Sequence, residues 1–170
     1  MAANKYIALI TGKLQEVVAT IISAGGANAN QIPALDATGR LDNSVMPVGI
    51  SAEVITVIAS ENIAAGAFVN IFNNAGVLNV RNADNTNNTK PANGFCLTAF
   101  LSAAVATVYS ISQRNTQLSS LTIGSDYFLG TVGAITVTPP STTGNIVQYL
   151  GRADSATSII FVNQNTIQVG

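Results

Sequence analysis

The sequence contains no histidine and no tryptophan, and charged side chains make up only 9% of its 170 residues. An average soluble domain carries about a quarter charged residues. The polar surface must therefore come largely from Asn, Thr, Ser and Gln side chains. Such a composition suits a protein that is part of an assembly.

A basic cluster and a long apolar run are missing as well. The net charge is −1 at pH 7 and the Lys and Arg residues are scattered, so no electrostatic footprint for nucleic acid is expected. The apolar runs at 55–59 and 99–108 are interrupted or too short to span a bilayer. We therefore predict neither a nucleic-acid nor a membrane partner.

The side chains used most often in catalysis are scarce. Without histidine no side chain has an ordinary pKa near neutrality, and a Ser-His-Asp triad is impossible. Cys96 is the single cysteine and lies in an apolar run, which predicts a buried and inert thiol. Asp36 and Asp42 flank a turn in which carboxylates usually cap backbone amides. We predict that the chain is not an enzyme and needs no cofactor or metal.

An enzyme of another kind, a carboxylate-based glycosidase subunit, would need two acids about 5–10 Å apart across a cleft. Nothing in the sequence brings such a pair together. No phosphate-binding glycine motif occurs either.

From residue 51 onward, short β-rich segments alternate with Gly, Asn and Pro turns. This regular spacing predicts an all-β body, a compact antiparallel β-barrel or sandwich. The expected strands are 52–59, 68–72, 77–81, 94–101, 106–111, 126–129, 134–138, 146–152, 158–162 and 166–169.

The first fifty residues are of a different kind. Two β-rich segments, 6–10 and 14–22, flank Thr11 and Gly12 and predict a small β-hairpin. A helix over 14–23 is the alternative, because its apolar residues also recur with helical spacing, but the β-branched residues favour a strand. Residues 23–30 are small and polar, which is typical of a linker.

Residues 31–47 fit neither the helix nor the strand pattern. Turn-forming residues separate single apolar residues, so the segment has little core of its own. We expect it to lie along another surface, each apolar side chain filling its own pocket. The chain then divides into a hairpin with an extended arm, 1–50, and a β-body, 51–170. The residues predicted to contact that other surface are Ile32, Leu35, Leu41, Val45, Met46 and Pro47.

Residues 82–91 form an Asn-rich stretch that is long for an ordinary connection. We interpret it as an exposed, solvated loop, and the alternative is a partner or glycan contact made through its amides. The residues that this hypothesis names are Asp84, Asn85, Asn87, Asn88 and Lys90. Six aromatic residues fall within expected strands and are assigned to the core: Phe68, Phe72, Phe95, Tyr109, Phe128 and Phe161. Neighbours Tyr127 and Phe128 must face opposite sides of their strand.

Two stretches resemble virion proteins of tailed bacteriophages. Residues 32–47 are similar to a Leu-Asp-Xaa-Xaa-Gly-Xaa-Leu/Ile-Asp core that leads into a short apolar run ending in Pro. Residues 121–153 look like the β-rich body of a small phage structural protein. The chain departs from the usual pattern at Ile123, where Pro is common, and at Phe128, where a second Tyr is common.

The resemblance implies a capsid decoration (cement) or head-fibre-like protein. Such a protein sits on the outer surface of the virion capsid as a homotrimer, binds the major capsid protein and stabilises the shell; it is made in the host cytoplasm. The alternative is a tail-fibre, head-fibre or adaptor protein that binds the host, with a host-surface glycan as partner of the Asn-rich loop.

Overall fold

The computed structural model describes residues 4–46 and 53–170. Contacts within the chain divide it into two compact units, Met1–Ser51 and Ala52–Gly170. The regular secondary structure is β-strand apart from two short 3-10 helices. The all-β prediction is therefore confirmed. Pro47, one of the predicted contact residues, lies outside the described residues.

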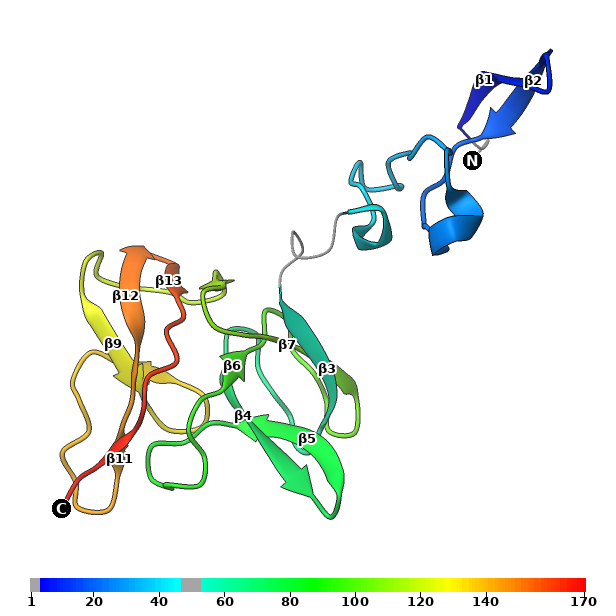
Figure 1. Ribbon diagram of the computed structural model, residues 1–170. Helices are drawn as coiled ribbons and strands as arrows, with labels where there is room; N and C mark the ends of the chain where they lie inside the picture. The colour runs from blue at the N-terminus through cyan, green and yellow to red at the C-terminus, as the bar shows by residue number, and fades with distance from the viewer. Residues whose placement is uncertain (1–3, 47–52) are drawn as a thin grey trace. The chain divides into compact units, whose positions relative to one another are not determined.

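The N-terminal unit begins with the predicted hairpin, drawn in blue in Figure 1. Strand β1 (Lys5–Ile10) pairs antiparallel with β2 (Lys13–Val18). Thr11 and Gly12 connect the strands with φ of 50° and 77°. Two positive φ angles are the hallmark of a type I′ turn, whose twist matches that of the flanking strands. The alternative of a helix over 14–23 is wrong.

The rest of this unit is more ordered than the sequence predicts. Thr20 forms a parallel bridge with Pro33, supported by the bond from the Ala34 N–H to the Thr20 carbonyl at 2.8 Å. The expected linker contains a 3-10 helix, η1 (Gly25–Asn28), and a second, η2 (Asn43–Val45), follows later. The segment after the hairpin thus folds back on itself instead of running as an extended arm. Backbone and side-chain hydrogen bonds, invisible in an apolar pattern, cause the difference.

The second unit contains a closed five-stranded barrel with the order β3-β5-β4-β6-β7. The strands are β3 (Val54–Ala59), β4 (Phe68–Asn74), β5 (Val77–Asn82), β6 (Gly94–Phe95) and β7 (Val105–Tyr109). The barrel departs from the expected antiparallel pattern at one pair, because β3 and β5 run parallel. Strand β4 lies between them in the sequence and pairs antiparallel with β5, so that β5 runs in the same direction as β3.

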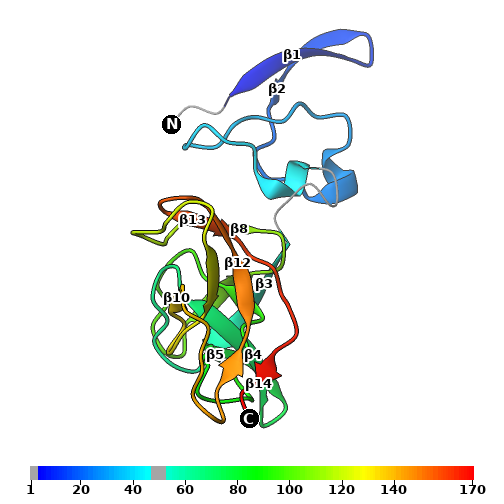
Figure 2. The ribbon, with the colours of Figure 1, turned by 90° about the vertical axis from the view of Figure 1, so that its left-hand side faces the viewer.

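A five-stranded sheet, with the order β10-β9-β12-β13-β8, packs beside the barrel. Figure 2 shows the orange strand β12 in front of the barrel strands β4 and β5. The short strands β11 and β14 pair separately. The bounds are β8 (Arg114–Asn115), β9 (Asp126–Leu129), β10 (Ile135–Thr136), β11 (Ile146–Val147), β12 (Tyr149–Ser155), β13 (Ser158–Ile160) and β14 (Ile167–Gln168).

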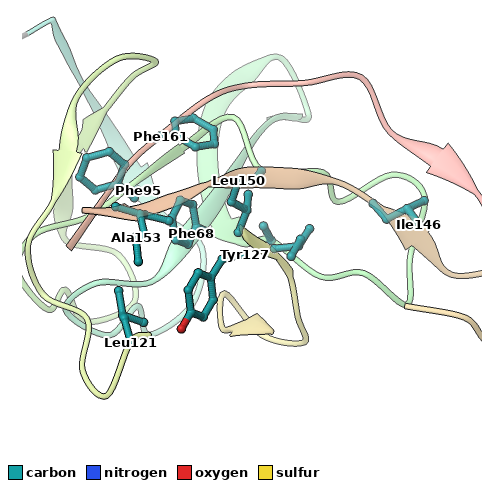
Figure 3. Close-up of a cluster of buried hydrophobic side chains, with 12 residues drawn as sticks. Phe68, Phe95, Leu121, Tyr127, Ile146, Leu150, Ala153 and Phe161 are labelled. Carbon is teal, nitrogen blue, oxygen red and sulfur yellow. The ribbon is translucent and has the colours of Figure 1, made fainter. Parts of the chain in front are cut away.

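Neighbouring residues of the barrel strands serve two different cores. Val69 and Cys96 belong to a cluster made by barrel residues, whereas Phe68 and Phe95 belong to a cluster shared with the second sheet. This is the period-two alternation of a strand that is covered on both sides. The shared cluster, shown in Figure 3, joins the barrel to the sheet through Phe161, Leu150 and their neighbours. The body is therefore held together by one apolar interface.

Close backbone packing requires glycine at one position of this sheet. Gly151 lies at a β-bulge where the pairing of β12 with β9 shifts register. Its φ is 149°, and an added Cβ would collide with the carbonyl oxygen of Ile160. A side chain at this position is excluded by the strand next to it.

The strand predictions hold best for β3, β4, β5 and β7 of the barrel. The expected strand at 94–101 shrinks to two residues, β6, and the segment 146–152 divides into β11 and β12. β8 was not predicted at all. Tyr127 is buried and its neighbour Phe128 is half-buried, so the two do face opposite sides. The assignment of Phe72 to the core is wrong, because it is only half-buried and belongs to neither core cluster. The guanidinium of Arg81 covers part of its ring, 4.2 Å from the centroid.

Candidate functional site

The described part of the N-terminal unit keeps almost no apolar side chain inside. Across residues 4–46, Ala34, at 9% exposure, is the one buried hydrophobic residue. Burial of apolar surface is the main force that holds a fold together, and this unit leaves most of its apolar surface in solvent. Its exposed large hydrophobic residues are Ile7, Leu9, Ile10, Leu14, Val18, Ile21, Ile22, Ile32, Leu35 and Leu41.

The predicted contact residues lie mainly on this surface. Ile32 and Leu35 are each 52% exposed and Leu41 is 43% exposed. Val45 and Met46 are partly buried. Three of the five described residues thus expose about half of their surface to a partner.

A tight turn holds Leu35 and Leu41 at its two ends. The Asp36 N–H donates to the Arg40 carbonyl at 2.8 Å. One Asp36 carboxylate oxygen accepts from the Thr38 N–H at 2.8 Å and from the Arg40 N–H at 3.0 Å. The hydrogen bond from the Thr38 side chain is the main reason that the pKa of Asp36 lies below its usual value. The carboxylate therefore shapes the turn, as the sequence predicts.

The second acid of this segment, Asp42, has the same kind of role. Its carboxylate accepts the Ser44 N–H at 2.9 Å, and hydrogen bonding to Ser44 lowers its pKa. The Oγ of Ser44 in turn accepts the N–H of Ser23 at 2.8 Å. Asp42 thereby helps to tie the end of the arm to the segment that follows the hairpin.

The Asn-rich loop of the body is less exposed than predicted. Asn85 is only 7% exposed, because its side-chain amide donates to the Leu129 carbonyl at 3.1 Å. The backbone carbonyl of Asn85 also accepts the Ile146 N–H at 2.7 Å. Asp84 and Lys90 are partly buried, whereas Asn87 and Asn88 are exposed. The prediction of an exposed Asn85 is wrong, since this residue stitches the loop to β9 and β11.

The exposed tip of the loop is built from two successive side-chain turns. The Asp84 carboxylate accepts the N–H and hydroxyl of Thr86, and the Asn87 amide oxygen accepts the same two groups of Thr89. Such bonds mimic a backbone turn. The Arg81 guanidinium donates to the backbone carbonyl of Thr89 at 2.9 Å and thereby ties the tip of the loop to β5. Residues 86–89 therefore form an ordered polar surface.

We expect the Asp84 turn to make stability fall in acid. Burial raises the pKa of Asp84, but the hydrogen bonds from Thr86 and Val132 and the charge of Lys90 together outweigh it, and the pKa lies below the ordinary 3.8. A depressed pKa contributes stability that is present above the unfolded value and lost as pH falls through the folded one. In urea unfolding, the free energy of unfolding of Asp84→Asn should therefore fall less than that of the wild type below about pH 4. Asn87 makes the same turn with an amide, so the substitution fits. An unchanged pH slope would contradict this role.

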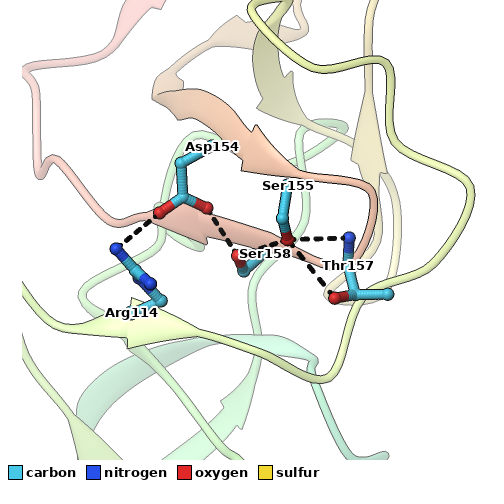
Figure 4. A network of polar contacts seen from close by, with 5 residues as sticks. All are labelled: Arg114, Asp154, Ser155, Thr157 and Ser158. Atoms are coloured by element: carbon cyan, nitrogen blue, oxygen red, sulfur yellow. Dashed lines mark hydrogen bonds and ion pairs between the residues drawn. The ribbon is translucent and has the colours of Figure 1, made fainter.

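A network of hydroxyls and charges lies in the five-stranded sheet of the body, at the turn between β12 and β13 (Figure 4). Asp154 pairs with Arg114 at 2.8 Å and accepts the Ser158 hydroxyl. The Ser155 hydroxyl lies 2.7 Å from that of Ser158 and accepts the Thr157 N–H at 3.1 Å. A serine beside a carboxylate resembles a nucleophile with its base, but Ser158 is 4% exposed. The geometry instead closes the turn over the bulge in β12.

Other reactive groups are equally shielded. Cys96 is fully buried, and burial raises the pKa of its thiol to about 12, as the inert-thiol prediction requires. Within the described ranges, no group of three metal-ligating acids or cysteines comes together. No helix in those ranges is long and apolar enough to cross a membrane.

Two hollows on the body are lined by small and apolar side chains. One, of about 330 Å³, lies between residues 64–67, 117–119 and 132–135. The other, of about 340 Å³, is lined by residues 62–64 and 99–101. Neither lining includes an ionisable side chain. General acid–base chemistry therefore has no group to act through in either hollow.

Comparison with known proteins gives a structural likeness but no match in sequence. No family model and no curated protein matches the sequence. Among solved structures, the fold is similar to the N base of the head fiber gp8.5 of bacteriophage phi29, at 13% sequence identity and a TM-score of 0.46. The match covers 68% of this chain and 99% of that one.

Proposed function

We propose that the chain is a non-enzymatic structural protein of a tailed-bacteriophage virion. In this proposal it binds the outer surface of the capsid as a homotrimer, contacts the major capsid protein through its N-terminal unit and stabilises the shell. The β-body is the part that faces solvent.

The observation that carries the proposal is the apolar surface of the N-terminal unit. With only Ala34 buried among residues 4–46, this unit cannot obtain its stability from its own core. Larger contiguous apolar patches on soluble proteins mark interaction sites. The segment that bears Ile32, Leu35 and Leu41 is also the one that resembles virion proteins.

Multiplicity turns weak single contacts into firm attachment. Each Å² of apolar surface that the arm buries contributes about 25 cal/mol before ordering costs are subtracted. Three linked arms make the second and third contacts intramolecular, which raises avidity by about 10²–10⁴. A weakly binding arm therefore suffices to hold a trimer on a capsid.

Around residues 84–89 the body has the kind of polar surface that the proposal needs on its solvent-facing side. Asn and Thr side chains form turns at its surface, as in residues 84–89, instead of exposing charges. Such a surface stays hydrated with little net charge, and it does not attract cations or nucleic acid over long range.

A second candidate function is host attachment by a head fibre, tail fibre or adaptor. It is favoured by the ordered tip at residues 86–89, where the exposed side chains of Asn87 and Asn88 stand on a fixed base. Side-chain amides are suitable hydrogen-bond partners for a host-surface glycan. Binding of the isolated chain on a glycan array, lost in Asn87→Ala/Asn88→Ala, would favour this function.

Immunogold labelling of purified virions with antibody against residues 53–170 tests the proposal. We expect gold over the whole head, because a decoration protein occupies many equivalent capsid positions. Gold confined to the tail or to one vertex would instead assign the chain to attachment. Virions without label would contradict both functions.

A further inference from the structure

One face of the N-terminal hairpin carries an apolar surface distinct from the arm. The register pairs Leu9 with Leu14 and Ile7 with Glu16, and alternate residues of each strand point to the same side. Ile7, Leu9 and Leu14 are 64%, 71% and 76% exposed. With Val18, at 52%, they form what we call the hairpin face.

The opposite side of the hairpin is mostly apolar too, and half of its residues are partly covered. Tyr6, Ala8 and Val17 lie there and are partly buried, whereas Ile10, Lys13 and Gln15 on the same side are exposed. A strand pair with apolar residues on both sides is typical of a sheet that is buried on both sides. An isolated two-stranded hairpin is marginally stable at best in water. The hairpin face therefore needs a cover that the described part of the N-terminal unit does not supply.

The charges on the hairpin face indicate what the cover is. Lys5 and Glu16 lie on the same side as the apolar residues and form an ion pair with each other. The face therefore carries one positive and one negative charge and no net charge. Copies that meet around a rotation axis must present complementary groups to their neighbours, and a balanced pair satisfies this condition because Lys5 of one copy can approach Glu16 of the next.

We propose that the hairpin faces of several copies of this chain pack together and form the core of its oligomer. Ile7, Leu9, Leu14 and Val18 supply the buried centre, and Lys5 and Glu16 form a polar rim that fixes the register between copies. This inference rests on the oligomer that the proposed function includes. It separates two tasks within the N-terminal unit: the hairpin joins copies, and the later arm contacts the capsid.

The solution mass of the full chain, without capsids, tests this assignment. Leu9→Thr/Leu14→Thr removes apolar surface but keeps the hairpin, because threonine favours strands and a Thr–Thr pair is a good cross-strand neighbour. Sedimentation equilibrium should give an oligomer for the wild type. The variant should be shifted toward monomer, with its dissociation constant raised at least about tenfold. Ile123→Thr/Val132→Thr, at exposed apolar positions of the body (68% and 65%), is the matched control and should keep the wild-type mass.

Charge exchange distinguishes self-association from a general loss of structure. Lys5→Glu alone and Glu16→Lys alone each give the face two like charges, so each variant should associate more weakly than the wild type at low salt. Mixing the two variants should restore association, because each then meets an oppositely charged copy. The double variant Lys5→Glu/Glu16→Lys should also associate, since it restores the balance within one chain.

The outcomes separate cleanly. A wild-type chain that stays monomeric at all concentrations overturns the inference, and the capsid is then the cover of the hairpin face. An unchanged mass for Leu9→Thr/Leu14→Thr overturns it as well, because the copies then meet elsewhere. Capsid binding is absent from these measurements, so a failure of the proposed capsid role leaves them unaffected.

Discussion

Leu35→Asp/Leu41→Asp is expected to abolish binding of the chain to capsids. Both leucines lie at the ends of the Asp36 turn and are about half-exposed, 52% and 43%. Burying a leucine stabilises a contact by about 1.5–3 kcal/mol, and burying an unpaired carboxylate is far more costly still. The pair of substitutions should weaken each arm by at least about 100-fold. Avidity multiplies this loss across a trimer.

The measurement is cosedimentation with capsids that lack this protein. Ile123→Asp/Val132→Asp adds the same charges to exposed apolar positions of the body and should bind like the wild type. The thermal unfolding of the body should be the same in all three proteins, since neither pair of residues belongs to its core clusters. Wild-type binding by the leucine variant would sink the proposal that this segment holds the capsid.

The sequence reveals most of the fold where local chemistry decides it. Thr11-Gly12 between two β-rich runs specifies the hairpin, because both residues adopt the positive φ angles of a type I′ turn. The parallel pairing of β3 with β5 was not predictable, since the same alternating pattern serves either direction. β8, of two residues, is too short to carry any periodic signal.

The functional surface was predicted in part. Exposure of Leu35 and Leu41 follows from single apolar residues spaced by turn formers, which cannot form a core together. The exposure of the hairpin face was not predicted, because its sequence pattern predicts strands but not whether another part of the chain covers them. Asn85 was misplaced for a related reason. Composition marks residues 82–91 as polar, but it does not show that the Asn85 side-chain amide donates to a carbonyl of β9.

Phe95→Ala should destabilise the body by about 3–5 kcal/mol, as is usual for truncating a buried phenylalanine. Phe95 is fully buried, and its ring contacts three others: Phe68 at 5.9 Å, Tyr109 at 5.6 Å and Phe161 at 6.2 Å between centroids. Phe161 follows β13 of the second sheet, whereas Phe68 and Tyr109 belong to the barrel. The substitution thus opens a cavity where the two sheets meet.

Urea unfolding of the chain, followed by tyrosine fluorescence and circular dichroism, measures the loss. Because the shared cluster joins barrel and sheet, both signals should report one transition for residues 53–170, shifted to lower urea in Phe95→Ala. Phe128→Ala is the matched control: Phe128 is half-buried and makes one aromatic contact, with Tyr149 at 5.8 Å, so its loss should cost only about 1 kcal/mol. Two separate transitions in the wild type would mean that barrel and sheet fold independently. The aromatic cluster would then be a contact between two domains, not the core of one.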